Sequence, residues 1–182
     1  MKESVTSAGF QDVIDLAVIH LDRSIDTELS GLIKRSKKTI VVVETITNGA
    51  LCNRLSRITR ATDQFLGGLV CPTTLSQMRL LAMPVPILKH HPATSAFVEG
   101  VLECIERRMK SDIYVTVTGV QHQPDLSSIK RKGVIIVGIQ YDGERRIKQL
   151  ELEGDATTIR NKAVQAALMI LKQWLSAKSP GG

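Results

Sequence analysis

The feature that most constrains the fold is a run of four β-branched apolar residues, Ile40 to Val43, which leads directly into a short polar turn. A strand with one wet face alternates apolar and polar residues, so this unbroken run predicts a central strand covered on both faces. From Ala50 the chain has helical spacing. In open α/β sheets ligands bind at the carboxyl ends of such strands, because the next helix points its positive N-terminus there. We therefore expect a functional site that begins at Glu44.

The remaining elements follow from apolar periodicity and turn residues. Helical spacing predicts helices over residues 10–22, 26–37, 50 onward, 75–83, 94–110 and 157–177. Strands are predicted over 65–71 and 113–118, and a hairpin over 134–139 and 146–152 around Asp142-Gly143. Residues 83–92 and 119–131 are expected to be loops. This alternation predicts an α/β fold, a three-layer α/β/α sandwich over a mixed, mostly parallel sheet.

The length of 182 residues suits one domain with an added terminal helix. We assign residues 1–24 to an N-terminal helical extension, 25–178 to the domain and 179–182 to a disordered tail. The extension offers an apolar helix face to a partner chain. No apolar run approaches the roughly 18–20 residues of a membrane span, and residues 1–9 lack the apolar segment of a signal peptide. We therefore expect a cytoplasmic protein with no membrane partner.

The positions of the cysteines and of the charged residues indicate which kinds of functional site are expected. Cys52, Cys71 and Cys104 stand singly, which favours buried thiols over a disulfide framework or a zinc site, with a nucleophilic cysteine as the minority alternative. The formal charge of +6 comes from basic clusters at 34–38, 107–110 and 130–132, which can meet phosphate. Aromatic residues make up only 3% of the chain, so base-stacking platforms and a nucleic-acid partner are not expected. No metal or cofactor is predicted.

Four short motifs follow one another in an order that is typical of a known family. They are Val43-Glu44-Thr45-Ile46-Thr47-Asn48-Gly49, Phe65-Leu66-Gly67-Gly68-Leu69-Val70, Thr118-Gly119 and Gly154-Asp155-Ala156-Thr157-Thr158-Ile159-Arg160. This order resembles the carboxy-terminal domain family of competence/damage-inducible protein A, CinA, whose hallmark is a strand that ends in A-E-S-C-T-G-G. The resemblance covers about residues 25–177. Each motif alone is weak, whereas their order together is fairly specific.

The resemblance implies the α/β/α fold, self-association into a homo-oligomer, a nucleotide-like small-molecule ligand and nicotinamide mononucleotide amidohydrolase activity. It puts Thr45 at the position of the family's candidate nucleophilic serine, and it puts further catalytic positions at Glu44, Gln77 and Thr118. The substrate-binding positions that it implies are Thr47, Asn48, Gly49, Gly67, Gly68, Gly119 and Arg160.

Two departures from the family pattern affect the activity that we expect. Gln77 stands at the position of the family lysine, and Pro72 stands at the position of the family tyrosine. A glutamine does not titrate, so it cannot act as a general base, and loss of a general base typically lowers the rate by about 10²–10⁴-fold. We therefore predict amidohydrolase ancestry with impaired or lost catalysis. One alternative is an active amidohydrolase, on nicotinamide mononucleotide or another small amide, that uses Thr45 with a rearranged base such as His122. The other is a non-catalytic nucleotide-binding or regulatory module.

Several of these residues have a structural explanation beside the functional one. Glu44 can orient a hydroxyl or a ligand, or it can cap the following helix. Thr45 and Thr47 can also serve as helix caps. Arg160 can reach a phosphate or pair with Asp155. The sequence leaves these alternatives open.

Overall fold

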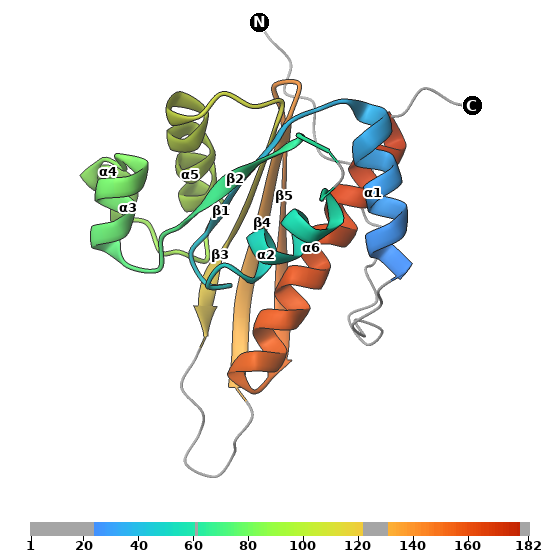
Figure 1. The fold of residues 1–182 in the computed structure, drawn as a ribbon. Helices are drawn as coiled ribbons and strands as arrows, with labels where there is room; N and C mark the ends of the chain where they lie inside the picture. Colours follow the sequence, from blue (N-terminus) through green and yellow to red (C-terminus); the bar gives the residue numbers. More distant parts are fainter. Residues whose placement is uncertain (1–23, 61, 122–130, 179–182) are drawn as a thin grey trace, which may run out of the picture.

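The computed structural model describes residues 24–60, 62–121 and 131–178, and Figure 1 shows helices on both faces of one sheet. In chain order the elements are α1 (Ser24–Ser36), β1 (Ile40–Glu44), α2 (Ala50–Ile58), β2 (Phe65–Val70), α3 (Thr74–Leu81), α4 (Val85–Leu88), α5 (Ser95–Arg108), β3 (Ile113–Gln121), β4 (Arg131–Tyr141), β5 (Glu144–Gly154) and α6 (Ala156–Lys178). Helices α1, α2 and α6 cover one face, and α3, α4 and α5 lie on the other side. The predicted three-layer α/β/α sandwich is confirmed.

The sheet has the strand order β2-β1-β3-β4-β5. Strand β1 pairs in parallel with both β2 and β3, while β3 with β4 and β4 with β5 are antiparallel. Four strands therefore run in one direction and only β4 runs against them, which confirms a mixed, mostly parallel sheet. The carboxyl ends of β1, β2, β3 and β5 consequently meet at the same edge, at the bottom of Figure 1.

The central strand explains why the sequence carries an unbroken apolar run. All five residues of β1 are buried. Ile40 and Val42 belong to the core beneath α1, α2 and α6, whereas Val41 and Val43 belong to the core on the side of α5. Because successive side chains of a strand point to opposite faces, each core requires apolar residues at alternate positions, and a strand between two cores needs them everywhere.

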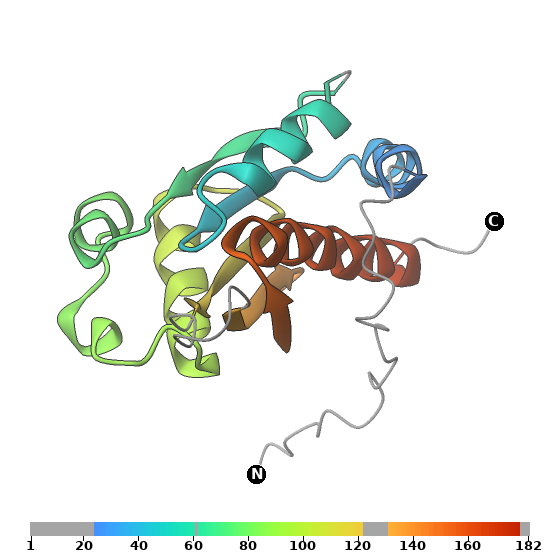
Figure 2. The ribbon, with the colours of Figure 1, turned by 90° about the horizontal axis from the view of Figure 1, so that it is seen from below.

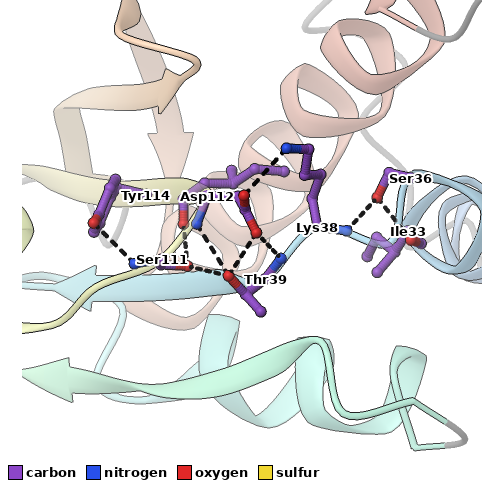
Figure 3. A network of polar contacts seen from close by, with 8 residues as sticks. Ile33, Ser36, Lys38, Thr39, Ser111, Asp112 and Tyr114 are labelled. Carbon is purple, nitrogen blue, oxygen red and sulfur yellow. Dashed lines mark hydrogen bonds and ion pairs between the residues drawn. The ribbon is translucent and has the colours of Figure 1, made fainter.

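A network of polar contacts fastens the amino ends of β1 and β3 to each other (Figure 3). The Asp112 carboxylate accepts hydrogen bonds from the backbone N–H and the hydroxyl of Thr39, both at 2.8 Å. It also pairs with Lys38 at 3.2 Å, and the Asp112 N–H donates to the Thr39 hydroxyl at 3.0 Å. On the side of α1, the Ser36 hydroxyl donates to the Ile33 carbonyl and accepts from the Lys38 N–H. These contacts fix the register between β1 and β3 at their amino ends, which are opposite to the carboxyl ends where the site is predicted.

Several predicted boundaries differ from those of the structure, and three differences are the most informative. The expected loop over 83–92 contains the short helix α4, which begins after Pro84 and has Pro86 in its first turn, where the fixed φ of proline suits a helix. The expected loop over 119–131 is shorter, because β3 continues to Gln121 and β4 begins at Arg131. Pairing with β4 carries β3 past Gly119. Helix α5 ends at Arg108, two residues before the predicted end.

Some sequence predictions lie outside the described residues. They are the amphipathic helix over 10–22, most of the 1–24 extension, the tail 179–182 and the loop residue His122. Within the described ranges, no helix is long and apolar enough to cross a membrane.

Candidate functional site

The predicted site lies at the carboxyl edge of the sheet. Backbone hydrogen bonds tie three strand ends together there. The Thr45 N–H donates to the Val117 carbonyl of β3 at 3.0 Å, and the Cys71 N–H donates to the Glu44 carbonyl at 2.7 Å. The N-termini of α2, α3, α5 and α6 follow these strands at the same edge (Figure 1). The fold therefore positions Glu44 at the end of β1, Thr45 directly after it, and Thr118 near the end of the neighbouring parallel strand β3.

Glu44 is fully buried, and both of its carboxylate oxygens accept hydrogen bonds. One oxygen accepts from the Thr47 hydroxyl at 2.5 Å and from the backbone N–H groups of Gly49 and Leu51 at 3.0 and 3.2 Å. The other accepts from the Cys52 N–H at 2.8 Å. A carboxylate in this position satisfies backbone donors in the first turn of α2 and neutralises the positive end of its dipole. Of the two interpretations of Glu44, the structure shows the helix cap, and the carboxylate also orients Thr47.

Thr45 presents a side-chain oxygen that has no hydrogen-bond partner. Its Oγ1 is buried, and no donor or acceptor in the described part of the chain contacts it. Burial of a hydroxyl without a partner is costly, so such atoms are rare in folded proteins. The hydroxyl at the family's nucleophile position thus makes no hydrogen bond to a base or to a stabilising donor within the described ranges.

The two other predicted catalytic residues are engaged elsewhere. The Gln77 amide donates to the Cys71 carbonyl at 3.1 Å, so it joins the first turns of α3 to the end of β2. The Thr118 hydroxyl donates to the Pro92 carbonyl at 2.9 Å and fixes the segment before α5 to the end of β3. Both side chains are buried. Each therefore holds a helix at the edge of the sheet, and neither hydrogen-bonds to Thr45.

The turn between β1 and α2 explains the choice of Asn48 and Gly49. Both residues have positive φ angles, 53° and 85°, which asparagine and glycine adopt at least cost. Asn48 is exposed, and the Gly49 N–H already donates to Glu44. An anion cradle built on this turn would have to compete with the Glu44 carboxylate for that donor.

The remaining predicted glycines do not lie together. Gly67 and Gly68 pair with Val41 and Val42 in the interior of β2, away from the strand end. A Cβ atom on Gly68 would lie 2.4 Å from the Cys52 sulfur, so this glycine allows α2 to pack closely on the sheet. Gly119 follows Thr118 at the edge, with a φ of 146°, and a Cβ atom there would lie 2.2 Å from the Val134 carbonyl oxygen. Close packing of the backbone accounts for Gly68 and Gly119.

Arg160 lies near the start of α6 and is partly exposed. Its side chain has no hydrogen bond or ion pair with another residue that the structure describes. The Asp155 carboxylate accepts from the Thr158 N–H at 2.6 Å and thereby caps α6. Of the two roles considered for Arg160, pairing with Asp155 is absent, and contact with an anion remains a prediction.

The remaining groups of chemical interest are the three cysteine thiols and the side chains that could bind a metal ion. Cys71 and Cys104 are buried, as predicted, and Cys52 is half-buried. Burial, together with the nearby Glu44 carboxylate, raises the pKa of the Cys52 thiol far above its usual range, so this cysteine is a poor nucleophile. Among the described residues there is no group of three or more His, Cys, Asp and Glu side chains that can share a metal ion.

Comparison with known proteins places this geometry in a family. A family model described as the CinA C-terminal domain matches residues 22–175. The chain belongs to the CinA C-terminal domain family. It is 27% identical over 156 residues to a CinA-like protein of Geotalea daltonii, covering 85% of this chain and 38% of that protein. The chain spans between 35% and 38% of the length of three curated relatives that it matches.

Solved structures of CinA proteins share the fold. The crystal structure of a competence or damage-inducible protein from Enterobacter asburiae has a TM-score of 0.71 at 19% identity and covers 83% of this chain and 96% of that one. A CinA superfamily protein from Enterobacter cloacae has the same TM-score at 16% identity, covering 95% of this chain and 99% of the other. At these identities the likeness establishes the architecture alone.

One polar cluster of this CinA domain was not predicted from the sequence. Arg54 is buried on α2, where it pairs with Asp26 of α1 at 2.8 Å and also hydrogen-bonds to Gln165 of α6. Beside it, an open groove of about 400 Å³ is lined by Asp26, Thr27, Ser30, Arg57 and Ile58. The groove lies at the opposite end of α2 from Gly49. Only the tertiary packing of α1 and α6 buries Arg54, so helical periodicity gave no sign of it.

Proposed function

We propose that this chain is a CinA-domain protein related to nicotinamide-nucleotide amidohydrolases and that it no longer catalyses the hydrolysis. The observation that carries the proposal is the state of the Thr45 hydroxyl, which is buried and has no partner in the described part of the chain. A hydroxyl is almost wholly protonated at neutral pH, so it needs a hydrogen-bonded base or a nearby cation to attack an amide. A cytoplasmic location belongs to the same proposal.

The neighbouring groups support this proposal because their hydrogen-bonding capacity is already used. Gln77, at the position of the family lysine, donates its amide to the Cys71 carbonyl. The N–H groups of Gly49, Leu51 and Cys52 all donate to Glu44. Amide hydrolysis passes through an oxyanion that needs preorganised donors, and these three N–H groups are not free to supply them.

The test is release of ammonia from nicotinamide mononucleotide by the purified full chain. We expect a rate equal to that of Thr45→Ala at the same concentration. A second pair of variants asks whether the fold can still support the reaction. Thr45→Ser with Gln77→Lys restores two family residues, and Thr45→Ser with Gln77→Met is its matched control without the amine. Activity in the lysine variant alone would support an intact scaffold with a lost base.

Turnover by the wild type that disappears in Thr45→Ala would refute the proposal. It would favour the alternative of an active amidohydrolase in which another group replaces the lost lysine. Repeating the assay with other small amides separates a change of substrate from a loss of chemistry.

A second candidate function, a nucleotide-binding module without chemistry, is favoured by Arg160. This guanidinium has no partner among the described residues and lies near the start of α6, at the same edge as Thr45. An arginine in such a position is suited to a phosphate. Calorimetric titration with nicotinamide mononucleotide should show binding that Arg160→Ala weakens at least tenfold. Arg57→Ala, in the groove at the far end of α2, is the matched control and should leave the affinity unchanged.

A further inference from the structure

Positive charge gathers at the amino edge of the sheet, opposite to the predicted site. Helices α1 and α5 both end there, at the top of Figure 1, and each carries basic residues in its last turn. Figure 2 shows these two helices on opposite sides of the sheet. Five basic side chains at these helix ends are exposed and make no hydrogen bond or ion pair within the described ranges. We call them the basic edge, and they are Lys34, Arg35, Lys37, Arg108 and Lys110.

The polar network around Asp112 holds the two helix ends side by side (Figure 3). Lys38 directly follows Lys37 and pairs with Asp112 at 3.2 Å, and the Thr39 N–H donates to the same carboxylate at 2.8 Å. Lys110 lies two residues before Asp112. The chain segments that carry Lys37 and Lys110 are therefore fastened to each other. Because Lys38 already neutralises Asp112, this carboxylate does not offset the charge of the basic edge.

The helix dipoles explain only part of this charge. A helix C-terminus carries about half of a negative elementary charge, so the ends of α1 and α5 together offset about one of the five positive charges. Two exposed acids at this edge, Asp63 and Asp142, are equalled in number by the exposed Arg60 and Arg107. About four positive charges therefore remain without compensation. The other acids at this edge have cations of their own: Glu103 and Glu106 have Arg145, and Glu144 has Lys178.

The side chains around the basic edge indicate which anionic partner suits it. The large apolar side chains that are exposed in the described part of the chain all belong to β2, α3 and α4. A surface that enters a membrane needs an apolar face, and a protein interface draws on aromatic or apolar anchors. A single strand of nucleic acid needs aromatic side chains on which its bases stack, but Tyr114 and Tyr141 in this region are buried. A duplex keeps its bases stacked inside and presents phosphates to the protein.

We propose that the basic edge binds the phosphate backbone of a nucleic-acid duplex without regard to its sequence. Lysine and arginine side chains neutralise phosphates and release the counterions that surround them. Five such contacts predict that the logarithm of the binding constant falls with the logarithm of the salt concentration with a slope of about −4.5. The expectation of no nucleic-acid partner rested on base stacking, which binding to a duplex does not need.

The test is the fluorescence anisotropy of a labelled DNA duplex of about 20 base pairs, titrated with the full chain at salt concentrations from about 50 to 200 mM. Arg35→Gln with Arg108→Gln removes one cation from the end of α1 and one from the end of α5. Glutamine keeps an anion away from the helix C-termini, so this double variant should fold. We expect the steepness of the salt dependence to fall by about 1.8 and the dissociation constant at about 50 mM salt to rise at least tenfold.

Arg79→Gln with Lys89→Gln is the matched control. Both residues are exposed at helix ends, in the last turn of α3 and at the C-terminal cap of α4, and they lie outside the basic edge. The control lowers the net charge by the same amount, so it should change the dissociation constant by less than about twofold. Thermal unfolding of both double variants measures any loss of helix stabilisation separately from binding.

The possible results decide the proposal. Absence of duplex binding at about 50 mM salt and about 100 μM protein would overturn it, since non-specific binding lies in the range of roughly 1–100 μM even at physiological salt. Equal weakening by the two double variants would also overturn it, because net charge alone would then explain the binding. Tighter binding to a single strand of the same length would contradict it as well. An RNA duplex titrated in parallel shows whether the basic edge distinguishes the two backbones, and binding of either duplex that depends on Arg35 and Arg108 supports the proposal. None of these outcomes depends on catalysis.

Discussion

Two threonines that are two residues apart in one turn should respond in opposite directions to the same substitution. The hydroxyl of Thr45 is buried without a partner, whereas the hydroxyl of Thr47 donates to the Glu44 carboxylate at 2.5 Å. Valine has almost the shape of threonine and replaces the hydroxyl by a methyl group. Thr45→Val and Thr47→Val therefore isolate the two hydroxyls while changing little else.

The magnitudes follow from these environments. A buried polar group without a hydrogen bond costs about 1–3 kcal/mol, so Thr45→Val should stabilise the fold by about 1 kcal/mol. A hydrogen bond to a charged group contributes about 1.5–3 kcal/mol, so Thr47→Val should lower the free energy of unfolding by about 2 kcal/mol. The two variants should differ by about 3 kcal/mol, or by about 6–12 °C in melting temperature for a domain of this size.

Urea unfolding followed by the fluorescence of Trp174 measures this difference. Trp174 is the one tryptophan in the chain and is 1% exposed, so its emission reports the loss of the core. Thr116→Val is the matched control, since the Thr116 hydroxyl in β3 is also buried without a partner among the described residues. It should be stabilising as well. If Thr45→Val lost 1 kcal/mol or more while Thr116→Val gained stability, the Thr45 hydroxyl would have a partner and the argument for lost catalysis would fail.

Three further predictions concern the same framework. Glu44→Gln replaces one acceptor oxygen by an amide that faces a backbone N–H, so we expect a loss of about 2–4 kcal/mol in unfolding free energy; a loss below about 1 kcal/mol by urea titration would contradict the capping role. Gly68→Ala puts a methyl group 2.4 Å from the Cys52 sulfur and 2.8 Å from the Val42 carbonyl oxygen, and should cost about 1–3 kcal/mol in thermal unfolding. Adding Cys52→Ala should recover only part of that loss, because the backbone contact stays. The backbone N–H of Thr39, followed by its hydroxyl and Lys38, lowers the pKa of Asp112 in the folded chain. Its stabilisation is therefore present above the unfolded pKa of about 4 and disappears as the pH falls through the lower folded value. Because the Asp112 side chain is 36% exposed, Asp112→Asn should cost no more than about 1 kcal/mol at pH 7 and almost nothing near pH 2.

The sequence was sufficient for features that depend on local pattern. The apolar run from Ile40 to Val43 predicted a strand between two cores, and helical spacing over 157–177 predicted the last helix, which the structure has at Ala156–Lys178. The Asp142-Gly143 turn lies between β4 and β5, as predicted. Each of these features depends on residues that are close together in the chain or that recur with the period of one helix or strand.

Features that depend on long-range packing were not predictable in this way. The role of Glu44 stayed open because a cap and a ligand contact need the same residue at the same strand end. Gly68 resembled a ligand-binding glycine, although the sulfur of Cys52 on α2 explains it. The burial of Arg54 depends on Asp26 and Gln165, which are 28 and 111 residues away. The periodicity of apolar residues along the chain cannot predict a contact between residues that only the tertiary fold brings together.

The position of β1 in the sheet has a consequence for synthesis on the ribosome. Its two neighbours, β2 and β3, follow it in the chain, and the residues that fasten β1 to β3, Thr39 and Asp112, are 73 positions apart. At about 5–20 residues per second, the most apolar strand of the chain waits about 4–15 s before its second neighbour is made. Contacts of such long sequence separation also slow folding, because the loop must close before pairing stabilises it. The strand that organises the native core is thus the segment most in need of protection while the chain is still nascent.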